Sequence, residues 1–195
     1  MTLPFSGSPT PPSRQHLVLV GFMGSGKSTV GRLLAERCGR ALVDVDEVIA
    51  KEAHESIPEL VRQHGTVALR ARERALMRRL LAVSEPLVIA TGGDTFLDPS
   101  IRQWLTSAAQ SVYLEADAET LVRRLKAGNA AEQRPLKPGP NLLDTVRRHL
   151  AAAAPIFRQA ALIIHNDGER IEDVVQEIAH QLRLDQHGRS LRRAV

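Results

Sequence analysis

Short apolar runs recur along the chain, with segments of helical periodicity between them. In each run the apolar residues are consecutive, which is typical of a strand buried on both faces of a parallel sheet. Because strands and helices alternate, the pattern predicts an α/β fold in which helices cover both faces of the sheet. The five predicted strands are 17–20, 41–43, 87–90, 111–114 and 162–164.

The predicted helices occupy the segments between and after these strands. The long segment 47–79 is expected to break near residues 56–58, where Pro58 suits a first helical turn, and again near Gly65. The last helix carries one apolar stripe, at Val174, Val175, Ile178 and Leu182. The five predicted helical segments are 28–37, 47–79, 118–126, 142–154 and 171–184.

Proline- and glycine-rich composition marks the segments that we expect to be loops. Residues 1–15 contain four prolines and three serines, which predicts a flexible N-terminal extension. Residues 127–141 contain three prolines, two glycines and no apolar period, which predicts a mobile lid loop. Residues 185–195 form a basic C-terminal tail. One domain is therefore expected over residues 16–184.

The composition of the 195 residues is that of an ordinary globular protein, with 43% hydrophobic and 25% charged residues. The single cysteine, Cys38, excludes an internal disulfide and a cysteine-based zinc cluster, and we expect it to be a small packing residue. No apolar run approaches the roughly eighteen residues that span a membrane, and the N-terminus lacks the pattern of a signal peptide. We therefore expect a cytoplasmic protein without a membrane partner.

A formal net charge of +4 raises the question of a nucleic-acid partner. Aromatic residues make up only 3% of the chain, so no stacking platform for bases is visible. Much of the excess charge lies in the last thirteen residues, at Arg183, Arg189, Arg192 and Arg193. A solvated tail accounts for this run, and we expect a monomer that binds no nucleic acid.

Residues 21–28 (GFMGSGKS) match the phosphate-binding pattern G-x-x-x-x-G-K-S/T between a predicted strand and a predicted helix. Glycines let backbone N–H groups face inward, and the following helix adds its positive N-terminal end. Lys27 supplies a charge for the β- and γ-phosphates of ATP, and the Ser28 hydroxyl ligates Mg²⁺. No Asn-Lys-x-Asp guanine-reading sequence occurs, so a small phosphotransferase is favoured over a GTPase. The predicted nucleotide-binding residues here are Gly24, Ser25, Gly26, Lys27, Ser28 and Thr29.

Two carboxylates, Asp44 and Asp46, end the second predicted strand. Residues at i and i+2 of a strand point to the same face. One carboxylate could therefore hold Mg²⁺ or its waters while the other accepts the proton of an attacking hydroxyl. In the alternative, structural interpretation, Asp46 is the N-cap of the next helix and Glu47 lies in its first turn. Behind a phosphate-binding loop we favour the catalytic interpretation.

Further segments follow in a fixed order: VDVDEVI, SIPEL, RARE, ATGG, RPL and PIF. Together with GFMGSGKSTVGRLLA they make the chain resemble the shikimate kinase family from about residue 17 to residue 184. The resemblance implies a three-layer α/β P-loop NTPase fold with a five-stranded parallel sheet. It also implies phosphorylation of one hydroxyl of shikimate by ATP and Mg²⁺, a step in aromatic amino-acid biosynthesis.

The same resemblance implies a role for each matching residue. Asp44 would support the metal through water, and Asp46 would bind the shikimate hydroxyls and act as the base. Arg70 would grip the substrate carboxylate, with Glu73 as its acidic companion. The remaining implied roles are phosphate and Mg²⁺ binding for Lys27 and Ser28, approach to the substrate ring for Gly92 and Gly93, closure of the lid onto the transferred phosphate for Arg134, and contact with adenine for Arg124 and Arg170.

Two of these arginines also have a plain structural interpretation. Arg134, on a proline- and glycine-rich loop, is placed to close over the site and neutralise developing charge, or it is a solvated loop residue. Arg70 either binds substrate or pairs on the helix surface with Glu73 or Glu59, where an ion pair contributes little.

Two positions depart from the family pattern, and both fall on the acceptor side. Asp94 stands where the family has a third glycine, and its carboxylate either adds negative charge or hydrogen-bonds a polyol or a loop amide. Ala153 stands where the family has a second carboxylate-binding arginine, whose charge-assisted hydrogen bond would contribute about 1.5–3 kcal/mol. Milder departures are Leu69 for phenylalanine and Lys137 for leucine, and the candidates to compensate for the missing arginine are Arg147, Arg148 and Arg158.

Two accounts of the acceptor stay open. The first, which we favour, is a shikimate kinase with a reorganised pocket. The second is a related kinase for another small cyclic or polyol hydroxyl, whose acceptor carries less negative charge. A regulator that binds or hydrolyses ATP without transferring phosphate is disfavoured, because Asp46 and Arg134 are both retained.

Overall fold

The computed structural model describes residues 15–127, 141–168 and 170–184. The predicted N-terminal extension except its last residue, the lid loop except its two end residues, and the basic tail therefore lie outside the described residues. Arg134 and Lys137 lie outside them as well.

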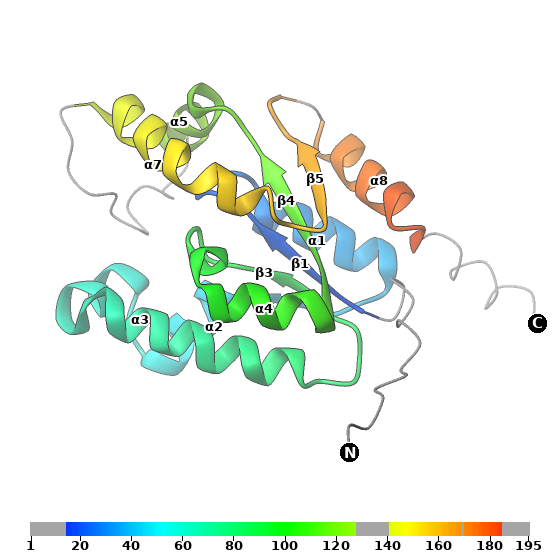
Figure 1. Cartoon of the computed structure of the whole chain (residues 1–195), viewed down its shortest axis with the longest axis horizontal. Coiled ribbons are helices and arrows are strands. Elements are labelled where there is room, and N and C mark those ends of the chain that lie inside the picture. The colour runs from blue at the N-terminus through cyan, green and yellow to red at the C-terminus, as the bar shows by residue number, and fades with distance from the viewer. Residues whose placement is uncertain (1–14, 128–140, 169, 185–195) are drawn as a thin grey trace, which may run out of the picture.

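Strands and helices alternate along the chain, as the apolar pattern predicts (Figure 1). The strands are β1 (His16–Val20), β2 (Leu42–Asp44), β3 (Val88–Ala90), β4 (Ala109–Glu115) and β5 (Leu162–His165). The helices are α1 (Lys27–Cys38), α2 (Val45–Ala53), α3 (Ile57–Leu81), the short 3₁₀ helix η2 (Thr95–Leu97), α4 (Pro99–Ala108), α5 (Ala118–Ala127), α7 (Leu142–Phe157) and α8 (Ile171–Gln181).

The five strands form one sheet in the order β2-β3-β1-β4-β5, and every neighbouring pair is parallel. This confirms the predicted parallel sheet. β1 lies at the centre, where Leu17 aligns with Val88 of β3 and Leu19 aligns with Val112 of β4. β2 and β3 lie on one side of β1, and β4 and β5 lie on the other side, so the direction of the connections reverses at β1. Ligands of such sheets bind at this switch point, outside the carboxyl ends of the strands.

Alternate residues of β1 belong to two separate apolar cores. Val18 and Val20 pack in a core that includes residues of α2, α3, α4 and α7. Leu17 and Leu19 pack in a second core with residues of α1 and α8. Figure 1 shows α1 and α8 on one side of the sheet and α3 and α4 on the other. The sheet is therefore the middle of three layers, as the consecutive apolar runs indicate.

The predicted breaks in the 47–79 segment are confirmed. α2 ends at Ala53, and α3 begins after Ser56, whose side chain and Glu59 form a reciprocal capping box. Pro58 lies in the first turn of α3. At Gly65 the backbone leaves the helical conformation with φ 77° and ψ 167°, which kinks α3.

The helix α4 is a finding that the apolar pattern did not predict. Asp98 caps it, because the Asp98 carboxylate accepts hydrogen bonds from the backbone N–H of Ser100 (2.9 Å) and of Ile101 (3.4 Å). Pro99 occupies the first turn. An acidic cap followed by proline is a sequence signal for a helix start, so this signal could have located the helix.

Two smaller expectations also hold. The α8 stripe is buried, since Val174, Val175, Ile178 and Leu182 are each at most 9% exposed. Cys38 is half-buried and packs against the second core. Within the described parts of the chain, no helix combines the length and the apolar character needed to cross a membrane.

Candidate active site

The segment 21–28 joins β1 to α1 at the centre of the sheet and leaves the start of α1 open. Gly26 precedes the helix in the left-handed conformation, with φ 89°, and no side chain caps the helix start. At Gly21 a Cβ atom would lie 2.9 Å from the Leu114 carbonyl oxygen, so only glycine fits against β4. Uncapped N–H groups at a helix N-terminus are a ready site for a phosphate.

Lys27 lies within this loop rather than in solvent. It is 7% exposed, and its Nζ donates hydrogen bonds to the carbonyl oxygens of Gly21 and Phe22, both at 2.8 Å. The ammonium group is therefore held beside the N–H groups that would cradle a phosphate. When a polyphosphate binds, its charged oxygens would become hydrogen-bond acceptors for the Lys27 ammonium group in place of the two neutral carbonyl oxygens.

Ser28 and Asp44 form a directly bonded pair across the start of α1 and the end of β2. The Ser28 hydroxyl donates to Asp44 Oδ2 at 2.6 Å. Asp44 Oδ1 accepts from the backbone N–H of Asp46 (3.0 Å) and of Glu47 (3.4 Å), so Asp44 is the N-cap of α2. The structural alternative that made Asp46 the N-cap is therefore wrong, because the helix begins one residue after Asp44.

Asp46 consequently lies in the first turn of α2, and the expectation that Asp44 and Asp46 both extend from a strand is wrong for Asp46. The side chain of Asp46 is half-buried. Asp46 nevertheless stays close to the carboxyl end of β2, because its backbone N–H donates to the Asp44 carboxylate that also bonds Ser28. The start of the helix at Val45 therefore leaves Asp44 and Asp46 close together, as expected from the sequence.

The Ser28–Asp44 pair fits Mg²⁺. Magnesium in nucleotide sites takes one or two protein oxygen ligands, together with waters and phosphate oxygens. Ser28 Oγ and the Asp44 carboxylate supply such oxygens. No cluster of three or more His, Cys, Asp or Glu residues suited to a metal occurs in the portion of the chain that the structure describes.

The loop after β3 approaches the phosphate-binding loop closely. Gly92 and Gly93 are buried. A Cβ atom on Gly93 would lie 3.2 Å from the backbone nitrogen of Met23, so a side chain at this position would press on the phosphate-binding loop. The absence of a side chain at Gly93 thus brings the nucleotide side and the acceptor side of the site together.

Arg70 extends from α3 to this same loop. Its Nη1 donates to Glu73 Oε2 at 2.6 Å, and its Nη2 donates to Asp94 Oδ2 at 3.0 Å. Glu73 is fully buried and also accepts a hydrogen bond from Thr95 Oγ1 at 2.9 Å. Glu59, the other candidate partner, bonds Ser56 instead. Arg70 therefore pairs with Glu73 and also reaches the acceptor loop, so its two interpretations are compatible.

His149 completes this group and was missed by the sequence reasoning. Its Nε2 lies 3.0 Å from Asp94 Oδ1, and its ring packs edge-on against Phe22 of the phosphate-binding loop, with centroids 5.1 Å apart. A carboxylate only accepts hydrogen bonds, so His149 Nε2 is the donor. The available signal was a histidine in the helix that carries Ala153, one turn earlier in the sequence.

On the nucleotide side, Asn166 links the phosphate-binding loop to Arg124 of α5. The Asn166 amide nitrogen donates to the Ser25 carbonyl at 2.8 Å, and its oxygen accepts from Arg124 Nη2 at 3.2 Å. Asn166 is 1% exposed. Burial, and then the charge of Arg123, lower the pKa of Arg124. Arg124 Nη1 and Ser25 Oγ are buried and have no hydrogen-bond partner among the described residues.

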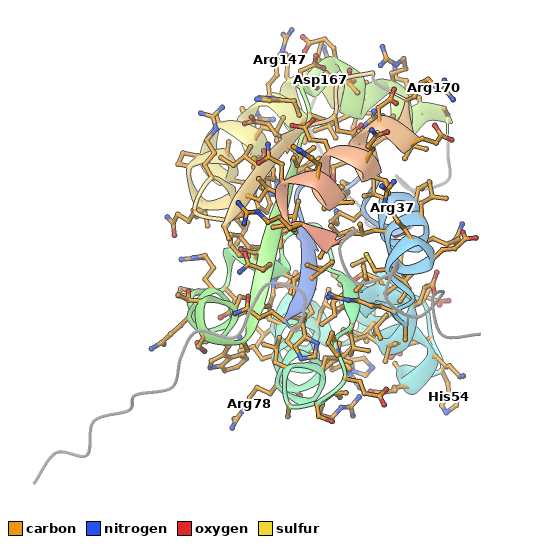
Figure 2. All side chains as sticks on the ribbon, turned by 90° about the vertical axis from the view of Figure 1, so that its right-hand side faces the viewer. Arg37, His54, Arg78, Arg147, Asp167 and Arg170 are labelled. Carbon is orange, nitrogen blue, oxygen red and sulfur yellow. The ribbon has the colours of Figure 1, made fainter. Side chains whose placement is uncertain are left out.

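Arg170 and Thr29 are less closely tied to the site. Arg170 precedes α8, and its side chain is 80% exposed, with Nε 3.8 Å from Glu172 Oε2. Figure 2 shows Arg170 and Asp167 at the same end of the molecule. Thr29 is exposed in the first turn of α1. The structure therefore joins Arg124 to the phosphate-binding loop but leaves Arg170 at the surface.

A family model described as shikimate kinase matches residues 23–183, most of the chain. The chain belongs to the shikimate kinase family. A shikimate kinase of Symbiobacterium thermophilum is 39% identical over 168 residues, which cover 86% of this chain and 95% of that protein. A shikimate kinase of Thermus thermophilus is 38% identical over 166 residues, covering 85% of this chain and 89% of that one.

Solved structures agree with this membership of the shikimate kinase family. The shikimate kinase of Acinetobacter baumannii in complex with shikimate superposes with a TM-score of 0.82 at 30% identity, covering 90% of this chain and 97% of that one. A gluconokinase of Sinorhizobium meliloti reaches a TM-score of 0.53 at 19% identity, which shows a common fold and nothing more. The predicted α/β P-loop fold is confirmed.

Within the shikimate kinase family, the two acceptor-side departures have a structural setting here. Asp94 bonds Arg70 and His149. Ala153 is 2% exposed and packs in the first core with Phe157, so the position of the expected second arginine is filled by core packing.

The three arginines considered as replacements have other partners. Arg147 pairs with Glu119. Arg148 Nε donates to the Asp144 carbonyl at 3.3 Å. Arg158 Nη2 lies 2.8 Å from Glu115 Oε1.

Proposed function

We propose that this chain is an ATP-dependent kinase that transfers the γ-phosphoryl group of ATP to a hydroxyl of shikimate, in aromatic amino-acid biosynthesis. The observation that carries the proposal is the meeting of two loops, since Gly93 packs against Met23 and brings the acceptor loop to the phosphate-binding loop. Membership of the shikimate kinase family supplies the acceptor. The proposal includes Mg²⁺, a monomer and a cytoplasmic location.

On the donor side, the uncapped N–H groups of α1 and the ammonium group of Lys27 bind the phosphates. Ser28 would ligate Mg²⁺, and Asp44 would orient a water on the metal. A Mg²⁺ ion held there would neutralise charge on the phosphate oxygens. Arg124, which Asn166 holds, and Arg170 are assigned to contact adenine.

On the acceptor side, Asp46 accepts the proton of the attacking hydroxyl. Its place two residues after Asp44, whose carboxylate bonds both Ser28 and the Asp46 backbone N–H, supports this role. Arg70 binds the acceptor carboxylate, and the backbone of Gly92 and Gly93 bounds the ring. Arg134, outside the described residues, is assigned to neutralise charge on the phosphoryl group in transfer.

The test is steady-state ADP release from purified protein with ATP and Mg²⁺. Shikimate is compared with quinate and with a panel of sugars and polyols. Saturable turnover that depends on shikimate is expected. ATP binding without shikimate turnover at millimolar concentration would contradict the proposal. Turnover of an uncharged polyol alone would favour the second candidate, a kinase with a less negative acceptor, which the contact between Arg70 and Asp94 also suits.

Replacing Asn166 with Ala should raise the KM for ATP about tenfold, while the KM for shikimate stays near its wild-type value. The variant loses a neutral bond to Ser25 and a charge-assisted bond to Arg124, each of the order of 1 kcal/mol or more. Initial rates with each substrate varied in turn separate the two constants. Gln181→Ala at the end of α8, away from both substrates, is the control. An equal rise in both KM values would mean that Asn166 supports the whole site and not the nucleotide side alone.

A further inference from the structure

The guanidinium of Arg70 is already bonded to two carboxylates that belong to the protein. Glu73 Oε2 lies 2.6 Å from Nη1 and Asp94 Oδ2 lies 3.0 Å from Nη2. The side chain of Glu73 is fully buried, whereas that of Asp94 is 29% exposed. Of the two carboxylates, Asp94 is therefore the one that a ligand can reach and replace on Arg70.

Glu73 has a fixed, supporting role. Its second oxygen accepts from Thr95 Oγ1 at 2.9 Å, so both carboxylate oxygens have partners in the protein. This buried acceptor holds the orientation of the Arg70 guanidinium. A ligand gains nothing by displacing it, because displacement would leave a buried charge without its partner.

Asp94 has a second partner that can retain it. Its Oδ1 lies 3.0 Å from His149 Nε2, and the His149 ring is positioned by its edge contact with Phe22. His149 lies four residues before Ala153 on α7, so both residues project from the same helix face. The chain thus has a hydrogen-bond donor one turn away from the position that lacks the expected arginine.

The net charge of the groups around Arg70 affects how well an acceptor carboxylate can bind there. Among the described residues that bond Arg70, the two carboxylates outnumber the guanidinium by one negative charge when His149 is neutral. An acceptor carboxylate would bring a third negative charge to the same cation. An uncharged acceptor group would not meet this repulsion. Like charges placed together at a binding site act as a device of selectivity.

We propose that Asp94 and His149 together determine acceptor specificity. Asp94 pairs with Arg70 before the acceptor binds and competes with the acceptor carboxylate for the guanidinium group. When the acceptor carboxylate binds Arg70, His149 keeps its hydrogen bond to Asp94. This inference rests on the proposed function, since it concerns how the same site accepts shikimate. Neither residue takes part in the phosphoryl transfer itself.

The test compares two acceptors of equal shape, shikimate and its carboxamide, in steady-state ADP release. Asp94→Asn is expected to lower the KM for shikimate about tenfold and to leave the KM for the carboxamide nearly unchanged, because only the charged acceptor competes with Asp94. Asp173→Asn, the same chemical change at an exposed position of α8, is the control and should change neither constant.

A double-mutant cycle then tests the role of His149. His149→Leu should raise the KM for shikimate when Asp94 is present and have no such effect in the Asp94→Asn background. His149→Gln, whose amide nitrogen can donate to Asp94, should restore the shikimate KM. This rescue distinguishes the loss of a donor from poor folding of the leucine variant.

Two outcomes would overturn the inference while leaving the proposed function intact. One is an Asp94→Asn variant that turns over both acceptors with equally changed KM values. The other is a rise in the shikimate KM, which would make Asp94 a binding group for the acceptor. Absence of turnover with both acceptors in the wild-type chain and in every variant would contradict the proposed function as well.

Discussion

Replacing Asp46 with Asn is expected to lower kcat with shikimate by about 10²–10⁴-fold while ATP still binds. A carboxamide has nearly the shape of a carboxylate but cannot accept the hydroxyl proton. Asp46 lies in the first turn of α2, beside the Asp44 carboxylate that bonds Ser28. Because Asp44 caps α2 and Asp46 does not, the substitution should leave the helix start intact.

The matched control is Glu47→Gln, the same chemical change at the adjacent, exposed residue of the same helical turn. We expect it to keep wild-type kcat. ATP affinity is measured by calorimetry without acceptor, and kcat by initial rates of ADP release. If Asp46→Asn kept a kcat within a factor of about ten of wild type, another group would be the base.

Repeating the Asp46→Asn assay at several pH values separates two ways in which activity could be lost. Loss of a base leaves a residual rate that rises with hydroxide concentration, since solvent must take the proton. Loss of acceptor binding raises KM and leaves the pH profile of kcat unchanged.

The regular parts of the fold were predictable because their signals are local. Consecutive apolar residues such as Leu17–Val20 report burial on both faces without reference to any other segment. The break at Gly65 follows from the conformational freedom of one residue. The helix α4 was missed because apolar periodicity alone was read, although Asp98 and Pro99 carry the start signal.

The nucleotide side of the site was predictable for the same reason. Residues 21–28 are contiguous, and their spacing alone specifies the chemistry. The acceptor side was less predictable, because its contacts join distant segments. Asp94 meets Arg70 across 24 residues of sequence and His149 across 55. No local pattern reports a contact of that kind, so the partners of Asp94 became known only from the structure.

Asp44 combines the cap of α2, which was considered only for Asp46, with the position beside Ser28 that was expected of Asp44 itself. A capping role and a metal-supporting role were weighed for neighbouring carboxylates. In the structure one oxygen of Asp44 accepts from the start of α2 and the other accepts from Ser28. The cap fixes the direction of the carboxylate, and this positions the second oxygen beside the proposed metal ligand.

Replacing Lys27 with Met should reduce kcat/KM by about 10²–10³-fold, the loss typical of removing one group that stabilises charge in the transition state. Methionine preserves the length and much of the volume of the lysine side chain but has no charge. Lys27 is 7% exposed, and its ammonium group bonds two carbonyl oxygens of the phosphate-binding loop. Its charge is therefore already fixed in position when the nucleotide arrives.

The control is Lys51→Met, the same change at an exposed residue near the end of α2, which should keep wild-type activity. Thermal unfolding of both variants shows whether loss of the bonds to Gly21 and Phe22 alters stability. If the Lys27→Met protein folds normally and loses kcat/KM as expected, the charge of the ammonium group is what stabilises the transition state. Wild-type turnover by a folded Lys27→Met protein would instead mean that the backbone N–H groups of the loop and the start of α1 suffice for the phosphate.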